Sequence, residues 1–309
     1  QQIYTIVKWL FALAAYGYLA YKLIVFDSYG EMLSEWRQIS AERYWSLLAV
    51  LALLPFNLLL EALKWKKITR NTVSLSTHSA VKAVLAGICS GFFTPNRTGD
   101  FIGRIAYLPV SYRAQGLTFS VVNSLTQNLT ILFFGIPACT VFFAAFYDNT
   151  GTHAVIYIAA ALLCLLLLLF FYLYLPRLSE KISSTKIKRF TDCLSSYTWK
   201  QSGGIILVSF VRYAVFCLQF FFMLYFFRVE LTLWQAAAVI PANYLLVTLT
   251  PSFALSESAV RASYAVFFIG MFSANIVGIA FAGVLIWFVN TIIPMLAGSF
   301  FLLKSGQKY

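Results

Sequence analysis

Six apolar runs, each about 20 residues long, dominate the sequence and restrict the folds that the chain can adopt. A run of this length crosses a bilayer as one helix. The chain is 61% hydrophobic and only 11% charged, which excludes an ordinary soluble domain. Once the two interrupted apolar segments described below are also counted, the remaining connecting segments are too short for a soluble catalytic domain. We predict an all-α polytopic membrane protein with six full transmembrane helices, at residues 5–26, 44–63, 118–146, 153–175, 204–227 and 274–302.

Lysine and arginine placement predicts the orientation, because positively charged loops stay in the cytoplasm. Basic residues cluster at 64–70, at 177–189 and near the C-terminus, whereas the segment 27–42 carries four acidic residues and one arginine. We expect a multi-pass protein of a bacterial cytoplasmic (inner) membrane with both termini in the cytoplasm. Two further apolar segments, 79–108 and 233–270, are interrupted by polar and helix-breaking residues. The orientation is consistent only if both are re-entrant helical hairpins, the first entering from the cytoplasm and the second from outside.

The two interruptions are similar to one another: TPNRTGDFIGR at 94–104 and TPSFALSESAVR at 250–261. Each begins with Thr-Pro and carries a carboxylate followed four residues later by an arginine, which places both side chains on one helical face. Each half of the chain reads as two spans, a broken hairpin and one span. We therefore predict two inverted halves, 1–150 and 151–309, with chance similarity of two short motifs as the alternative. Many secondary transporters hold substrate between such repeats.

These interruptions are predicted to bind substrate. Irregular backbone at bilayer depth survives only where it is buried in protein or lines a wet cavity, and a helix starting after a proline directs amides toward that space. Arg97 has no acidic partner in its own motif, and a guanidinium suits a phosphate. The predicted substrate-binding residues are Pro95, Asn96, Arg97, Gly99, Asp100, Arg104, Arg212, Pro251, Glu257 and Arg261. The alternative is that the carboxylate–arginine pairs only hold the hairpins closed.

Two charged residues inside the apolar runs, Glu61 and Arg212, are expected to have different environments. Glu61 lies beside Lys64 near the end of a run and is expected to snorkel toward water. Arg212 lies too deep to do so and is expected to face the cavity or a carboxylate such as Glu257.

Polar and small residues supply further expectations. Asn123 and Gln127, one helical turn apart, bridge helices or line the path. Gly99 and Gly103 permit left-handed backbone or a close approach of two helices. Five scattered cysteines and two histidines show no metal-ligand spacing, so no metal and no cofactor are expected.

At these residues the sequence resembles the transmembrane region of the lysylphosphatidylglycerol synthase family, a flippase-like module that also occurs without the soluble synthase domain. Its Pro-Gly-Arg-x-Gly-Glu-x-x-Arg element is matched by Pro95, Asn96, Arg97, Thr98, Gly99 and Asp100, with Arg104 one residue late. Its Thr-Pro-Gly-Gly-x-Gly-x-x-Glu element is matched by Thr250, Pro251 and, one residue early, Glu257. An early span that ends in Arg-Trp-like residues is matched by EALKWK at 61–66.

The chain departs from the family pattern at several positions. A Glu-Arg-x-x-Asp element expected after the first hairpin is replaced by Asn123, Ser124 and Gln127, and two glycines after Pro251 are absent. An arginine expected before Pro294 is Trp287. These departures indicate a divergent member, so the resemblance implies movement of a lipid between leaflets but not which lipid.

The function favoured by these features is a lipid flippase or transporter for an anionic or polar-headgroup lipid, and not an enzyme. Two alternatives stay open: an intramembrane enzyme acting on a lipid-linked substrate through Asp100 and Glu257, and a small-solute secondary transporter. A membrane lipid is the expected partner, with no nucleic acid. A homodimer and a complex with a separate lipid-synthesising enzyme also stay open.

Overall fold

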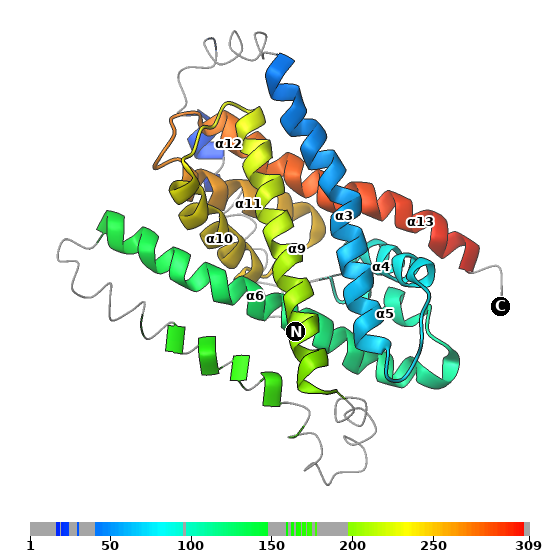
Figure 1. Ribbon diagram of the computed structural model, residues 1–309. Coiled ribbons are helices and arrows are strands. Elements are labelled where there is room, and N and C mark those ends of the chain that lie inside the picture. The colour runs from blue at the N-terminus through cyan, green and yellow to red at the C-terminus, as the bar shows by residue number, and fades with distance from the viewer. Residues whose placement is uncertain are drawn as a thin grey trace. The chain divides into compact units, whose positions relative to one another are not determined.

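The structure is a computed structural model that describes residues 41–94, 97–147 and 197–305, together with single residues and short pieces within 17–30 and 159–177. Every regular element in these parts is helical. Figure 1 shows the elements in chain order from blue to red. They are η1 (Ala41–Arg43), α3 (Tyr44–Thr69), α4 (Thr77–Phe92), α5 (Gly99–Ile105), η3 (Val110–Tyr112), α6 (Arg113–Tyr147), α9 (Trp199–Phe226), α10 (Leu233–Leu249), α11 (Ala254–Ile269), α12 (Ile276–Trp287), η4 (Phe288–Ile292) and α13 (Ile293–Ser305).

Four helical segments in the described parts are long and apolar enough to cross a membrane: Ala41–Thr69, Val110–Phe146, Trp199–Phe226 and Ile276–Phe301. They coincide with four of the six predicted runs. The prediction of an all-α polytopic membrane protein is therefore confirmed. The other two predicted spans, 5–26 and 153–175, lie mostly outside the described residues.

Both interrupted segments fold as a helix, a break and a second helix. In the first, α4 ends at Phe92 and α5 begins at Gly99. Pro95 and Asn96, inside that break, lie outside the described residues. In the second, α10 ends before Thr250, whose backbone is extended, and α11 begins at Ala254, so Pro251 lies in the break. The predicted positions of the interruptions are confirmed.

Small residues let α5 lie directly against α4. A Cβ added to Gly99 would stand 2.3 Å from the carbonyl oxygen of Ser90, and one added to Gly103 would stand 2.4 Å from that of Ala86. The Ser90 hydroxyl donates to the Gly99 carbonyl oxygen at 2.8 Å, and the Gly99 amide donates to the Thr94 hydroxyl at 2.6 Å. Of the two predicted uses of these glycines, close helix approach is therefore the one found.

The last span contains a π-helical segment, η4, between α12 and α13. The Ile293 amide donates to the Phe288 carbonyl oxygen, five residues earlier. Pro294 follows at once and has no amide to donate, which disrupts the α-helical ladder at this point. The predicted single apolar run is thus one continuous but locally widened helix.

The chain divides into two compact units. Unit 1 comprises Gln1–Pro55, Phe134–Ala154 and Val215–Ile293, and unit 2 comprises Phe56–Phe133, Val155–Ala214 and Pro294–Tyr309. Each unit draws residues from both predicted halves, 1–150 and 151–309, and the inverted repeat stays a prediction.

Each unit has its own apolar packing. In unit 2, Trp65 packs edge-on against Phe119 with ring centroids 6.4 Å apart, inside a core that includes Ile68, Val84 and Ile205. In unit 1, Phe142 and Phe268 pack edge-on at 4.8 Å. The first hairpin, α4 with α5, belongs to unit 2, and the second, α10 with α11, belongs to unit 1.

Candidate functional site

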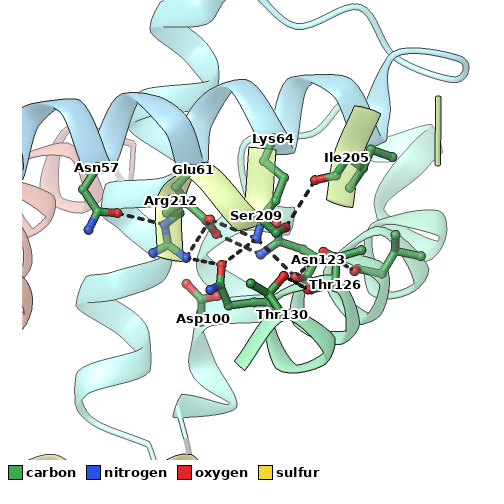
Figure 2. A network of polar contacts seen from close by, with 12 residues as sticks. Asn57, Glu61, Lys64, Asp100, Asn123, Thr126, Thr130, Ile205, Ser209 and Arg212 are labelled. Atoms are coloured by element: carbon green, nitrogen blue, oxygen red, sulfur yellow. Dashed lines mark hydrogen bonds and ion pairs between the residues drawn. The ribbon is translucent and has the colours of Figure 1, made fainter. Parts of the chain in front are cut away.

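A group of buried charged and amide side chains lies in unit 2, where α3, α5, α6 and α9 contribute to it. We call this group the Glu61 cluster. Figure 2 shows Glu61 directed toward Lys64 and Arg212, with Asn123 and Asp100 close by. The members of the cluster are Asn57, Glu61, Lys64, Asp100, Arg104, Asn123, Gln127 and Arg212.

Glu61 is the centre of the cluster, and its side chain is only 3% exposed. One carboxylate oxygen forms an ion pair with Arg104 Nη1 at 2.7 Å and accepts a hydrogen bond from Asn123 Nδ2 at 2.9 Å. The other lies 3.2 Å from Lys64 Nζ and 3.1 Å from Arg212 Nη1. A single carboxylate therefore pairs with three cations that come from three different helices.

Arg104 connects the first hairpin to this centre. Besides Glu61, its guanidinium donates through Nε to Asp100 Oδ2 at 2.9 Å, and it lies 5.5 Å from the centroid of the Trp65 ring. Gly87 on α4 leaves room for the pair, since a Cβ there would stand 2.4 Å from Asp100 Oδ1. The predicted pairing of Asp100 with Arg104 is present, and Glu61 is a second carboxylate partner of Arg104.

Arg212 is held from two other helices. Its Nε donates to Asn57 Oδ1 and its Nη1 donates to Gln127 Oε1, each at 2.9 Å. The expectation that Arg212 faces a carboxylate is met by Glu61, whereas the carboxylate suggested for it, Glu257, pairs with Arg261.

Lys64 is fully buried, with 0% of its side chain exposed. Its ammonium group lies 3.3 Å from the Asn123 carbonyl oxygen and 3.4 Å from Gln127 Oε1, as well as near Glu61. The prediction that Glu61 snorkels to water beside Lys64 is therefore wrong. Charges of both signs, supplied by three helices, offset the cost of burying these two groups.

Asn123 and Gln127 bridge helices, which is one of the two roles predicted for them. Asn123 on α6 donates to Glu61 on α3, and Gln127 accepts from Lys64 on α3 and from Arg212 on α9.

The cluster carries an excess of positive charge. Lys64, Arg104 and Arg212 supply three positive charges, while Glu61 and Asp100 supply two negative charges, so the sum is +1. Arg97 is exposed and lies beside Asp100 over Gly91, where an added Cβ would stand 3.5 Å from Arg97 Cβ and 3.3 Å from Asp100 Cβ. Its φ is 56°, a left-handed conformation that few non-glycine residues adopt. The surroundings therefore favour an anion, and paired guanidinium groups suit phosphate.

The second hairpin carries its own ion pair in unit 1. Arg261 Nη2 lies 2.7 Å from Glu257 Oε1, and its guanidinium stands 5.8 Å from the Tyr244 ring centroid. The Thr250 hydroxyl lies 2.9 Å from that of Tyr264. This pair has one cation and one carboxylate, so it has no excess charge comparable to that of the Glu61 cluster.

The predicted site residues thus fall into two sets. Unit 2 brings Asp100, Arg104 and Arg212 into the Glu61 cluster, with Arg97 beside Asp100 and Gly99 at the contact between α4 and α5. Unit 1 holds Pro251, Glu257 and Arg261.

The sequence prediction missed the central carboxylate and two of its neighbours, although the sequence carries a signal for them. Asn57, Glu61 and Lys64 are spaced four and three residues apart, so they form one polar stripe on an otherwise apolar helix. A stripe of this kind inside a span indicates a buried polar contact and not a helix end facing water.

Comparison with known proteins identifies the family of this chain. The sequence profile described as lysylphosphatidylglycerol synthase TM region matches residues 9–298. A search of curated proteins and a search of solved structures gave no significant match. Because the match covers most of the chain, this protein belongs to the lysylphosphatidylglycerol synthase TM-region family.

Proposed function

We propose that the protein is a lipid flippase that moves a lipid with an anionic or polar headgroup between the leaflets of a bacterial cytoplasmic membrane. Family membership supports a function related to membrane lipids. The proposal of a flippase depends on one observation: the Glu61 cluster buries one more positive charge than negative charge. An uncompensated buried charge is costly, so its presence indicates a function such as binding an anion.

The depth of the cluster suits a headgroup on its way through a membrane. Glu61 and Thr69, the last residue of α3, are eight residues apart, which corresponds to about 12 Å along the helix. Arg212 lies near the middle of α9. A phosphate that reached these groups would have left the lipid–water interface while its acyl chains stayed in lipid.

The contacts suggest how a phosphate is received. Arg212 and Asp100 keep 16% and 19% of their side chains exposed, whereas Glu61 and Lys64 are closed off. A phosphate approaching along this open side can take up donors of Arg212 and Arg104 that now point to carboxylates. Exchange of one anion for another leaves the cations paired at every stage, which avoids an uncompensated buried charge.

The proposal retains the predicted inverted repeat. Helices α4 and α5 form one re-entrant hairpin and α10 and α11 the other, in halves 1–150 and 151–309 inserted with opposite polarity, with both termini in the cytoplasm. Such hairpins in inverted repeats hold substrate in secondary transporters. The second hairpin pairs one cation with one carboxylate, whereas the Glu61 cluster around the first hairpin has an excess positive charge, so we assign initial capture of an anion to the first hairpin.

The proposal assigns transport and no bond-breaking step to this chain, and a membrane lipid is its only required partner. Neither a second subunit nor a separate lipid-synthesising enzyme is needed for it.

A leaflet assay tests the proposal. Protein is placed in liposomes that contain a fluorescent phosphatidylglycerol analogue, and a membrane-impermeant quencher reports the fraction of analogue in the outer leaflet over time. We expect the protein to accelerate exchange, and Arg97→Ala and Arg212→Ala to abolish the acceleration. Arg70→Ala is the matched control, because it removes one exposed arginine near the end of α3 and outside the cluster. Wild-type exchange no faster than in protein-free liposomes, or full activity in Arg97→Ala, would count against the proposal.

A further inference from the structure

A second candidate site lies in unit 1, at the first turn of α3 and the last turn of α9. It is a cavity of about 490 Å³, within the usual size range of small-molecule sites. Four aromatic side chains form most of its wall, and one carboxylate, Glu230, lines it. Both helices are candidate spans, and the cavity lies at the end of each.

The aromatic wall is ordered by ring contacts. The Trp45 ring packs edge-on against Phe222 with centroids 5.2 Å apart, and it lies 6.0 Å from the Tyr225 ring. Trp45 nevertheless remains 49% exposed. Aromatic faces carry negative charge density, and an ammonium group placed over them is attracted to it.

An ion pair between Arg43 and Glu230 lies at the edge of this aromatic wall. Arg43 Nη2 lies 2.5 Å from Glu230 Oε1, and Arg43 Nη1 donates to the Tyr225 carbonyl oxygen at 2.7 Å. The Arg43 guanidinium also lies 4.7 Å from the centroid of the Tyr225 ring. The Arg43 side chain is 16% exposed and that of Glu230 is 70% exposed. The arginine is therefore fixed, and the carboxylate is accessible to a ligand.

We propose that this cavity, the Glu230 pocket, binds the zwitterionic headgroup of a phospholipid of the phosphoethanolamine type. The ammonium group lies against the Trp45 and Phe222 rings and pairs with Glu230, and the phosphate accepts from Arg43. One positive and one negative charge, side by side, complement a headgroup that carries one of each. A purely anionic headgroup has no partner for Glu230, so the pocket discriminates against it.

The position of the Glu230 pocket at the ends of two spans favours a lipid headgroup over a soluble zwitterion as its ligand. The ends of two spans place the pocket at headgroup depth, and its apolar residues can contact the first carbons of the lipid. Tryptophan and tyrosine at this depth also form the aromatic belt common to membrane proteins. A belt alone requires no fixed arginine and no carboxylate on the cavity wall, whereas a headgroup site does.

The pocket belongs to unit 1 and the Glu61 cluster to unit 2, so binding here is a property additional to the proposed flippase activity. It is measured as binding and does not require lipid movement. A failure of this inference and a failure of the flippase proposal are therefore distinguishable.

Native mass spectrometry of the detergent-purified chain tests the inference. Short-chain phosphatidylethanolamine and short-chain phosphatidylglycerol are offered at equal concentration, and the bound lipid is counted. We expect a preference for phosphatidylethanolamine, which Glu230→Gln and Trp45→Ala each reduce about three- to fivefold without lowering phosphatidylglycerol binding. Glu42→Gln is the matched control, because Glu42 is an exposed carboxylate of the preceding turn that does not line the pocket.

Three results would overturn the inference: no preference in the wild-type protein, an equal loss in Glu42→Gln, or free phosphoethanolamine competing as well as the lipid. Glu230→Asp keeps the charge and is expected to retain most of the preference. A normal thermal midpoint in each variant shows that the lost binding does not reflect unfolding.

Discussion

Glu61→Gln is the most informative single substitution in the cluster, because glutamine keeps the shape of the side chain and removes only the charge. The Asn123 amide can still donate to the remaining carbonyl oxygen. Three cations lose their shared partner, at 2.7 Å for Arg104, 3.1 Å for Arg212 and 3.2 Å for Lys64. The net charge of the cluster rises from +1 to +2 in a part of the protein that water hardly reaches.

The expected cost is large. Removing one partner of a buried ion pair destabilises a protein by about 3–5 kcal/mol. With 2–4 °C for each kcal/mol in a chain of this size class, the apparent unfolding midpoint falls by roughly 6–20 °C. We expect this loss in detergent solution, measured by the temperature dependence of tryptophan fluorescence.

Glu257→Gln is the comparison that isolates the effect of burial and multiple pairing. Glu257 pairs with Arg261, whose side chain is 20% exposed, and losing a hydrogen bond to a charged group costs about 1.5–3 kcal/mol before solvent screening. Glu61→Gln should therefore unfold at a clearly lower temperature than Glu257→Gln. If the two variants unfold together, or Glu257→Gln unfolds first, the view of Glu61 as the shared partner of three buried cations is refuted.

Glycine substitutions provide the other predictions. In Gly87→Ala the new Cβ would meet Asp100 Oδ1 at 2.4 Å, so we expect slowed lipid exchange in the leaflet assay and a stability loss of about 1–3 kcal/mol. In Gly103→Ala the Cβ would meet the backbone oxygen of Ala86 at 2.4 Å; a similar or larger loss is expected in thermal unfolding. Gly203→Ala meets nothing within 4 Å and should leave stability unchanged or raise it by up to about 1 kcal/mol. A loss in Gly203→Ala equal to that in Gly103→Ala would contradict the packing argument.

The elements predicted best from the sequence are those fixed by local chemistry. Long apolar runs predicted the four spans found in the described parts, and Thr-Pro followed by polar residues predicted where both hairpins break. The spacing of four residues predicted the pairing of Asp100 with Arg104 and of Glu257 with Arg261. Each of these depends on neighbours within one or two helical turns.

The partners of Glu61 could not be predicted in this way. Apart from Lys64 they come from α5, α6 and α9, and although the polar stripe on α3 indicates that Glu61 is buried, nothing local shows which groups of other helices it meets. The same limit applies to Arg212, for which the sequence offered Glu257 and the fold supplied Glu61. Long-range pairing of charges is decided by helix packing, which short motifs do not encode.

Two neutral residues explain why the cluster has an excess of positive charge. The family resemblance leads us to expect Glu and Asp at the positions of Asn123 and Gln127, and these two amides now contact Glu61, Lys64 and Arg212. Two carboxylates there, together with the arginine that the same element places at Ser124, would change the net charge from +1 to 0. The departure from the family pattern therefore alters the property that the proposed anion site depends on.

A double variant separates the charge of the cluster from its shape. Glu61→Gln with Lys64→Met removes one negative and one positive charge, so the net charge returns to +1, and methionine fills the space of the lysine stem. Replacing buried charged partners together by groups of similar volume is often neutral. We expect the double variant to unfold at a higher temperature than Glu61→Gln alone. Strictly additive losses would mean that Lys64 and Glu61 act through separate contacts, and the cluster would then be a set of independent bonds without a shared charge balance.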